Sequence, residues 1–186
     1  MQALLAASRA IDAVNRWIGR HVSWLILVAV VISAGNAVIR KLFDTSSNAW
    51  LELQWQLFGA VFMLAAAYTL LVNEHVRIDV INARFSKRTR DWIDLLGHTL
   101  FLLPLCLLLL YDGMPFFWQS FVGNEQSSNA GGLTVWPSKL LLPLGFFLLA
   151  LQGVSEIVKR IAVMRGLIAD PLDRDHHAAA ADEHGA

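Results

Sequence analysis

Few residues in this sequence have side chains that could carry chemistry inside a packed structure. His98 lies well inside a long apolar run, whereas Asp112 and Glu156 are expected near the ends of such runs. A histidine at this depth could bind haem, relay a proton, or form a hydrogen bond between helices near the inner membrane surface. A cytochrome b-type site needs a second histidine at similar depth, and His21 and His75 lie at segment ends. We therefore expect the hydrogen-bonding role.

The other reactive residues do not form a recognisable site. Cys106 is the single cysteine, so an intramolecular disulfide and a multi-cysteine metal site are excluded, and we expect it to behave as a small hydrophobic residue. His176, His177 and His184 are not spaced as ligands of a rigid metal site. The sequence has no phosphate-binding loop, no zinc-protease motif and no dinucleotide fingerprint. We predict no catalytic residue, no cofactor and no metal, and therefore no enzyme.

The composition points to a membrane protein. Of the 186 residues, 56% are hydrophobic and 16% are charged, and the mean hydropathy is +0.50. Soluble domains carry about 45–50% apolar and about 25% charged residues. The formal net charge is zero, so no overall basic field favours nucleic acid as a partner.

The apolar runs predict an all-α membrane protein with four transmembrane helices, since about 20 apolar residues are needed to cross a bilayer. The runs cover residues 21–39, 56–73, 93–121 and 137–158 within a membrane domain of residues 21–165. Residues 1–20 have a helical period with a polar face, which predicts either an amphipathic helix in the cytoplasmic interface or a poorly ordered start. The acidic, small-residue segment 166–186 is predicted to be a disordered cytoplasmic tail.

Local features stand out before the second apolar run and within the third. Trp50 and Trp55 flank Glu52 just before the second run, which predicts an interfacial helix that turns inward. The third run is longer than a bilayer requires, and Pro104 is the expected site of a kink.

The distribution of cations predicts the orientation. With four spans, both termini and the loop after the second span share one side, which collects 12 of the 15 Lys and Arg residues. Arg40, Lys41 and Lys139 lie on the other side. The positive-inside rule therefore predicts an inner-membrane protein with both termini in the cytoplasm. Residues 21–39 also look like a signal peptide, but cleavage would put the basic loop and the tail on opposite sides, so we expect the segment to be retained.

Several local sequence patterns lie between the apolar runs. The sequence Trp-Leu-Glu-Leu-Gln-Trp (50–55) leads into the second run, and Asn-Glu-His-Val-Arg-Ile-Asp-Val (73–80) follows it, with a basic segment at 84–90. Glu-Gln-Ser-Ser (125–128) and Trp136-Pro137 precede the fourth run. Together these patterns resemble the small membrane subunit of tripartite ATP-independent periplasmic (TRAP) transporters. The resemblance extends from the first run to about residue 159, and its most specific part is His-Val-Arg-Ile-Asp (75–79).

This resemblance implies a scaffold subunit without a transport pathway of its own. Its partners would be a large membrane subunit that moves sodium and substrate, a periplasmic binding protein that delivers an organic acid, and membrane lipids. The residues that we expect to contact partners or to stabilise the fold are Trp50, Glu52, Trp55, Arg77, Asp79, Glu125, Trp136 and Lys139. Two alternatives stay open at this stage: the membrane anchor of a respiratory enzyme with His98 as a haem ligand, and a self-contained small carrier.

Overall fold

The chain is an elongated bundle of long helices. The computed structural model describes residues 1–45, 47–72 and 86–169. The predicted loop after the second span is described only from residue 86 onward. The predicted C-terminal tail is described only as far as residue 169. Within the described part, four helices are long and apolar enough to cross a membrane. The predicted all-α fold with four spanning helices is therefore confirmed.

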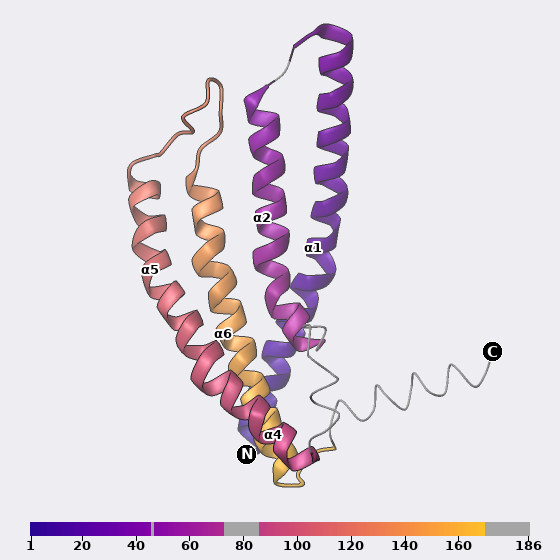
Figure 1. Cartoon of the computed structure of the whole chain (residues 1–186), viewed down its shortest axis with the longest axis vertical. Helices are drawn as coiled ribbons and strands as arrows, with labels where there is room; N and C mark the ends of the chain where they lie inside the picture. Colours follow the sequence, from indigo (N-terminus) through magenta and orange to yellow (C-terminus); the bar gives the residue numbers. More distant parts are fainter. Residues whose placement is uncertain (46, 73–85, 170–186) are drawn as a thin grey trace, which may run out of the picture.

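Figure 1 shows the order and arrangement of the helices. Their bounds are α1 (Gln2–Phe43), α2 (Asn48–Leu71), α4 (Lys87–Leu96), the π-helical segment η1 (Gly97–Leu102), α5 (Leu103–Val122) and α6 (Trp136–Met164). In the described residues, extended structure is limited to an isolated antiparallel bridge between Gln126 and Thr134.

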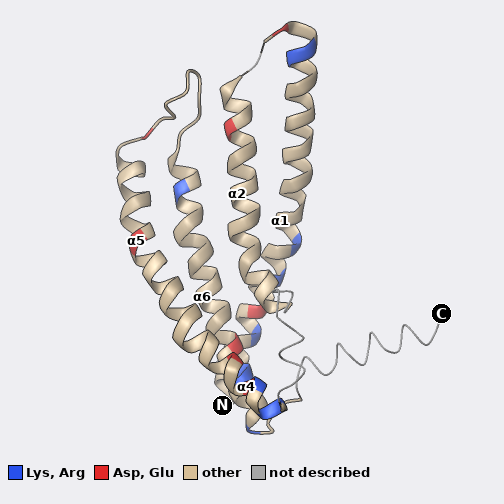
Figure 2. Ribbon diagram, viewed as in Figure 1, with Lys and Arg blue, Asp and Glu red and all other residues tan. Residues whose placement is uncertain are grey.

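Helix α6 is the centre of the bundle. It packs against α1, α2 and α5, and it also contacts η1 and α4. The start of α1, the short helix α4 and the end of α6 lie together at one end of the molecule, and the α1–α2 and α5–α6 connections lie at the other (Figure 1). Charged residues gather at these two ends, with few between them (Figure 2). The two charged ends with an apolar middle fit the four membrane crossings predicted from the sequence.

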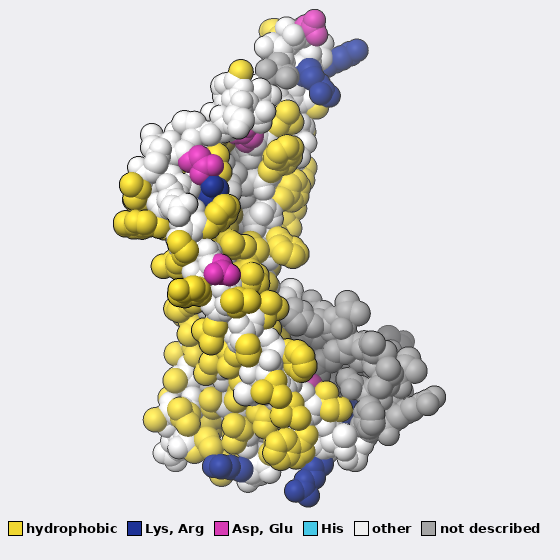
Figure 3. Space-filling view, turned by 60° about the vertical axis from the view of Figure 1, so that its left-hand side comes forward, with side chains coloured by type: hydrophobic (Ala, Val, Ile, Leu, Met, Phe, Trp, Pro, Cys, Tyr) yellow, Lys and Arg dark blue, Asp and Glu magenta, His cyan; other side chains and the backbone are white. Residues whose placement is uncertain are grey.

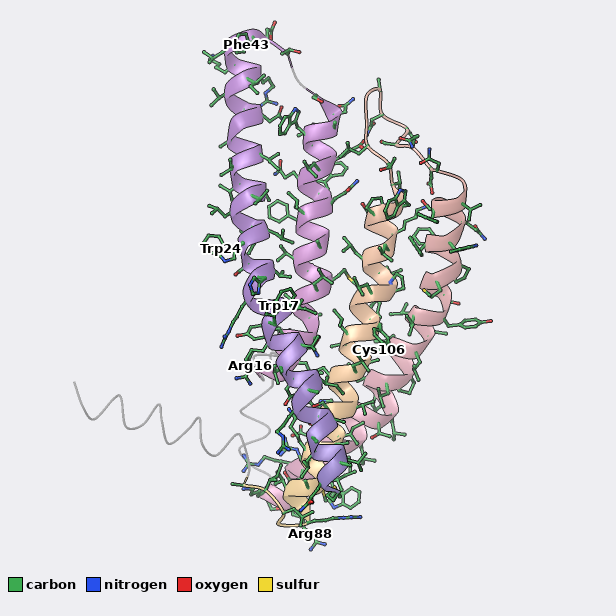
Figure 4. All side chains as sticks on the ribbon, turned by 180° about the vertical axis from the view of Figure 1, so that it is seen from behind. Arg16, Trp17, Trp24, Phe43, Arg88 and Cys106 are labelled. Atoms are coloured by element: carbon green, nitrogen blue, oxygen red, sulfur yellow. The ribbon has the colours of Figure 1, made fainter. Side chains whose placement is uncertain are left out.

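The first helix differs from the predicted boundary near residue 20. Residues 2–43 form one continuous helix, about 63 Å long at 1.5 Å per residue. The structure has no break at this position because the polar side of residues 1–20 packs along α6, where Ser8 and Asn15 are buried. Figure 4 shows Arg16 and Trp24 projecting from the outer side of the same helix, below Phe43 at its far end.

The second and third helices also refine the expectations. Residues 48–71 form one helix, so the tryptophan-rich segment before the second span belongs to α2 and is not a separate interfacial helix. In the third segment the regular helix is interrupted by η1 immediately before Pro104. Proline lacks a backbone N–H and its ring crowds the preceding turn, so the interruption lies where the sequence predicted a kink.

Glycines allow the backbones to approach closely at two helix crossings. A Cβ atom added to Gly19 of α1 would lie 2.3 Å from the Tyr68 ring of α2. One added to Gly145 of α6 would lie 2.8 Å from the backbone oxygen of Met63 in α2. Small residues at such crossings are typical of membrane helices, because association there depends on tight packing and not on the removal of apolar surface from water.

These crossings predict opposite effects for two Gly-to-Ala substitutions. Gly145→Ala inserts a methyl group against the α2 backbone, and overpacking of this kind costs about 1–3 kcal/mol. Gly35→Ala in α1 meets no atom within 4 Å and improves helix propensity. We expect thermal unfolding in detergent to shift downward for Gly145→Ala, and to stay unchanged or shift upward for Gly35→Ala. Equal melting temperatures for Gly145→Ala and the parent chain would contradict close α2–α6 packing.

Candidate functional site

Polar side chains of one face of α2 hold the loop between α5 and α6. Asn48, Glu52 and Gln56 are spaced four residues apart, so they line one side of the helix near its start. Asn48 donates to the Ala130 carbonyl at 2.9 Å, and Gln56 donates to the Thr134 carbonyl at 3.1 Å. The outer loop is therefore anchored at two points on α2, on either side of Glu52.

Glu52 is the central acceptor of this loop anchor, and its residue is only 8% exposed. Its Oε1 accepts hydrogen bonds from the Ser127 hydroxyl and from Asn129 Nδ2, the latter at 2.7 Å. Its Oε2 accepts from the backbone N–H of Leu133 at 2.7 Å. Bonds from several donors to one charged carboxylate are among the stronger interactions in proteins. Both oxygens of Glu52 are therefore used within the chain.

The loop is also ordered by its own backbone. The N–H of Ser127 donates to the Leu133 carbonyl at 3.0 Å, and the N–H of Val135 donates to the Glu125 carbonyl at 2.9 Å. Gly131 has φ of 69°, a left-handed conformation that glycine adopts without strain. The loop therefore forms a small hairpin-like cap above α2.

Glu125 and Lys139 connect this cap to the start of α6. Lys139 Nζ donates to Glu125 Oε2, and the same ammonium lies 4.3 Å from the centre of the Phe116 ring. The hydrogen bond from Lys139 lowers the pKa of the Glu125 carboxyl below its usual value of 4.5. Trp136 adds aromatic contacts with Phe117 and Phe121 of α5. These contacts give Glu125, Trp136 and Lys139 a place in one outer junction of α5 and α6.

The remaining site residues predicted from the sequence fall elsewhere. Trp50 and Trp55 lie on the surface of α2, 45% and 69% exposed. Arg77 and Asp79 lie outside the described residues. His98 is half-buried in η1, which packs on α6. Cys106 is fully buried, and Figure 4 places it within the α5 region of the bundle.

A second polar cluster joins α1 and α6 at the opposite end of the bundle. Asn15 Nδ2 donates to Gln152 Oε1 at 2.8 Å, and the Ser8 and Ser155 hydroxyls are 2.7 Å apart. All four side chains are buried. In an apolar environment such groups must be paired within the protein, so these bonds fix the register of α1 on α6.

Asp12 extends the same cluster with a charge. It accepts from Ser155 at 2.7 Å and from Gln152 at 3.0 Å, and it pairs with Lys159 at 3.1 Å. Lys159 also pairs with Glu156 at 2.6 Å. The cation and both carboxylates are thus partnered inside the chain.

A third contact holds α4 against the end of α6. The two guanidinium nitrogens of Arg160 donate to Asp91 Oδ1 at 2.9 Å and to Asp94 Oδ2 at 2.8 Å. The two aspartates are three residues apart and share a face of α4, so one planar guanidinium reaches both. This contact secures the helix that follows the basic loop.

These two inner contacts were missed by the sequence reasoning. The sequence predicts that residues 1–20 lie in the membrane interface or are poorly ordered, and that Glu156 lies near the end of a span. The available signal was spacing: Ser8, Asp12 and Asn15 recur at positions i, i+4 and i+7, as do Gln152, Glu156 and Lys159. Two such stripes on different helices are complementary if they face each other.

Asp112 lies in the third of the helices long enough to span a membrane, Lys87–Val122. It lies midway along α5, ten residues before Val122, or about 15 Å from the helix end. Its side chain is exposed on the helix surface. Ionisable residues inside spanning helices are rare and commonly face protein or a water-filled cavity, so the exposure of Asp112 on this apolar helix is unusual.

The arrangement can hold elements together, but its described residues do not assemble reactive groups. No three His, Cys, Asp or Glu side chains of the described part are grouped as a metal site. The hydrogen-bonded clusters described above each join two or more helices, and the charged residues gather toward the two ends of the bundle (Figure 2).

Comparison with known protein families gives one match. The family described as "Tripartite ATP-independent periplasmic transporters, DctQ component" matches residues 28–163 of the chain. No curated protein and no solved structure matches the chain with significance. The matched range contains the outer loop, its Glu52 anchor and nearly all of α6, and it begins after the polar part of α1.

The loop anchor predicts a specific effect of Glu52→Ala. The substitution leaves three donors of the loop without their acceptor, and a hydrogen bond to a charged group contributes about 1.5–3 kcal/mol. We expect amide hydrogen exchange of Ser127 to Leu133 to become at least about tenfold faster. Gln54→Ala, on the other side of the same helix, is the matched control and should leave exchange in the loop unchanged. Unaltered exchange in Glu52→Ala would show that the loop is held by its own backbone.

The Glu125–Lys139 pair predicts a pH dependence. Because the pKa of Glu125 is lowered in the folded chain, the pair stabilises the junction above about pH 4.5 and loses this effect as pH falls through the lowered pKa. Lys139→Met should raise the pKa of Glu125 toward its usual value, measured by the infrared carboxylate band of isotope-labelled protein. High salt should reduce the shift in the parent chain, because the carboxylate is 43% exposed. An identical titration of both proteins would exclude the pair.

Proposed function

The chain belongs to the DctQ component family of tripartite ATP-independent periplasmic transporters, and we propose that it is the small scaffold subunit of such a transporter. The observation that carries this proposal is the family match over residues 28–163, which includes most of the four spanning helices. The family is one of transporter components and not of enzymes. The chain is accordingly a multi-pass membrane protein of a transport system.

The distribution of polar groups supports the scaffold role. Transport pathways are marked by ionisable residues that face a cavity or another helix inside the membrane. In the described part of this chain, Glu52, Asp12 and Arg160 are each engaged in holding helices or the outer loop. Most of its polar residues are committed to a fixed arrangement, which suits a subunit that supports the moving part of another protein.

The proposed assembly follows from the family. A large membrane subunit would carry the substrate, an organic acid, together with sodium, and a periplasmic binding protein would deliver the substrate. The cap formed by residues 123–135 would face the periplasm, and both termini would lie in the cytoplasm of a bacterial cell, as the cation distribution predicts. Arg77 and Asp79 are proposed contacts with the large subunit or with lipid headgroups at the cytoplasmic side.

Purification and reconstitution test this function together. Affinity purification of the chain from its native membrane in mild detergent should recover a much larger polytopic membrane protein in stoichiometric amount. Liposomes that contain both proteins, given binding protein and substrate, should accumulate an organic acid only with an inward sodium gradient. Liposomes with either membrane protein alone should not accumulate it. Recovery of flavin or iron–sulfur subunits, or flux through this chain alone, would refute the proposal.

A further inference from the structure

Asp112 is an acidic side chain on the outer surface of an apolar helix. The space-filling view shows acidic side chains at the upper end of the molecule and also within the hydrophobic surface of its middle part (Figure 3). Figure 2 shows an acidic position midway along α5, where Asp112 is the single acidic residue in the helix sequence. In the described part of the chain, no hydrogen bond or ion pair engages its carboxylate.

The residues around Asp112 form an outward stripe. Leu105, Leu108 and Tyr111 lie three residues apart and are 52%, 57% and 78% exposed. Asp112 is the next residue after Tyr111 and lies four residues after Leu108, so it shares their side of the helix. We call these four residues the α5 stripe.

The depth of the stripe follows from the aromatic residues beyond it. Trp118, 60% exposed, lies in the aromatic end of α5 that is typical of a membrane interface. Asp112 lies six residues before Trp118, or about 9 Å deeper along the helix. On this spacing we expect the carboxylate to lie below the interface, about one helical turn deeper than Phe116 and the Lys139 ammonium beside it, where lipid offers no hydrogen-bond donor.

The other outward surfaces differ from the α5 stripe in charge. Residues 21–39 of α1 and 57–71 of α2 contain no Asp, Glu, Lys or Arg, although Val31 and Phe62 are 62% and 77% exposed. Those surfaces can face lipid tails without removing a charge from water. The α5 stripe cannot do so with an ionised Asp112, because ionisable residues at this depth face protein or water and pair with an opposite charge.

We propose that the α5 stripe is the surface on which a membrane helix of the transporter's large subunit packs, with an Arg or Lys of that helix paired to Asp112. The proposal rests on the proposed function, which supplies a membrane-embedded partner, and it assigns the contact to one helix and one ion pair. The apolar members of the stripe supply the packing surface, and the carboxylate selects a cationic partner.

Cross-linking locates the contact surface. The photoreactive residue p-benzoylphenylalanine is placed at Leu108 on the stripe or, in a matched chain, at Val31 on the outward side of α1. After irradiation of native membranes, the Leu108 probe should form a covalent adduct with the large subunit, identified by mass spectrometry. An adduct from Val31 and none from Leu108 would overturn the assignment to α5 while leaving the scaffold function intact. So would an adduct of the Leu108 probe with a second copy of this chain.

Substitution of Asp112 tests the ion pair. Loss of one member of a buried charge pair increases dissociation, so Asp112→Leu should raise the rate at which the large subunit washes off the immobilised chain by about thirtyfold or more. Asp112→Glu keeps the charge and should retain most of the complex, and Asp112→Asn should fall between the two. Equal amounts of each variant in the membrane confirm that folding is not the cause.

The results separate this inference from the proposed function. Equal retention of the large subunit by Asp112→Leu and the parent chain would refute the ion pair and leave the function standing. Failure to recover a large subunit with the parent chain would refute the proposed function, and the proposed contact with it.

Discussion

The structure depends on one constraint, which is that polar groups carried into an apolar environment must find partners there. The contact between Asn15 and Gln152 shows how the chain meets it. Both side chains are buried, they come from opposite ends of the sequence, and their hydrogen bond is possible only when α1 and α6 lie in one register. A shift of one residue would rotate each stripe by about 100° and leave its members without partners. The bonds therefore specify the arrangement of the first and last helices.

This constraint makes α6 the axis of the molecule. At one end α6 binds α1 through Gln152 and α4 through Arg160. At the other end Lys139 joins it to the loop that Glu52 anchors on α2. Between these ends, Gly145 allows the α2 backbone to approach closely. Polar contacts thus set register at the two ends of α6, and close packing sets distance in the middle, which gives a body with little freedom to rearrange.

The sequence predicted the features that depend on local composition and periodicity. The four spanning helices, an irregular helical turn close to Pro104 and the polar loop before α6 follow from apolar length, proline chemistry and turn residues. The sequence did not reveal that residues 1–20 continue into the first span as one helix packed on α6, because a polar helical face is equally consistent with water and with a polar partner helix. The Glu52 anchor could not be predicted either, since its donors lie more than 70 residues away and meet it only through the fold. Pairings of this kind depend on which faces meet, and one sequence does not contain that information.

The same reasoning explains why the chain suits a permanent partner. Most side chains of α1 and α5 are exposed and most of those of α2 are half-buried, whereas α6 contributes the largest share of the buried residues. Lipid can cover apolar side chains at no cost, so exposure of Val31 or Phe62 needs no explanation. An exposed carboxylate midway along α5 is different, because neither lipid nor the described part of the chain satisfies it. A chain that uses Glu52, Asp12 and Arg160 in internal contacts, yet presents Asp112 outward, has the surface expected under our proposal that another membrane protein covers α5.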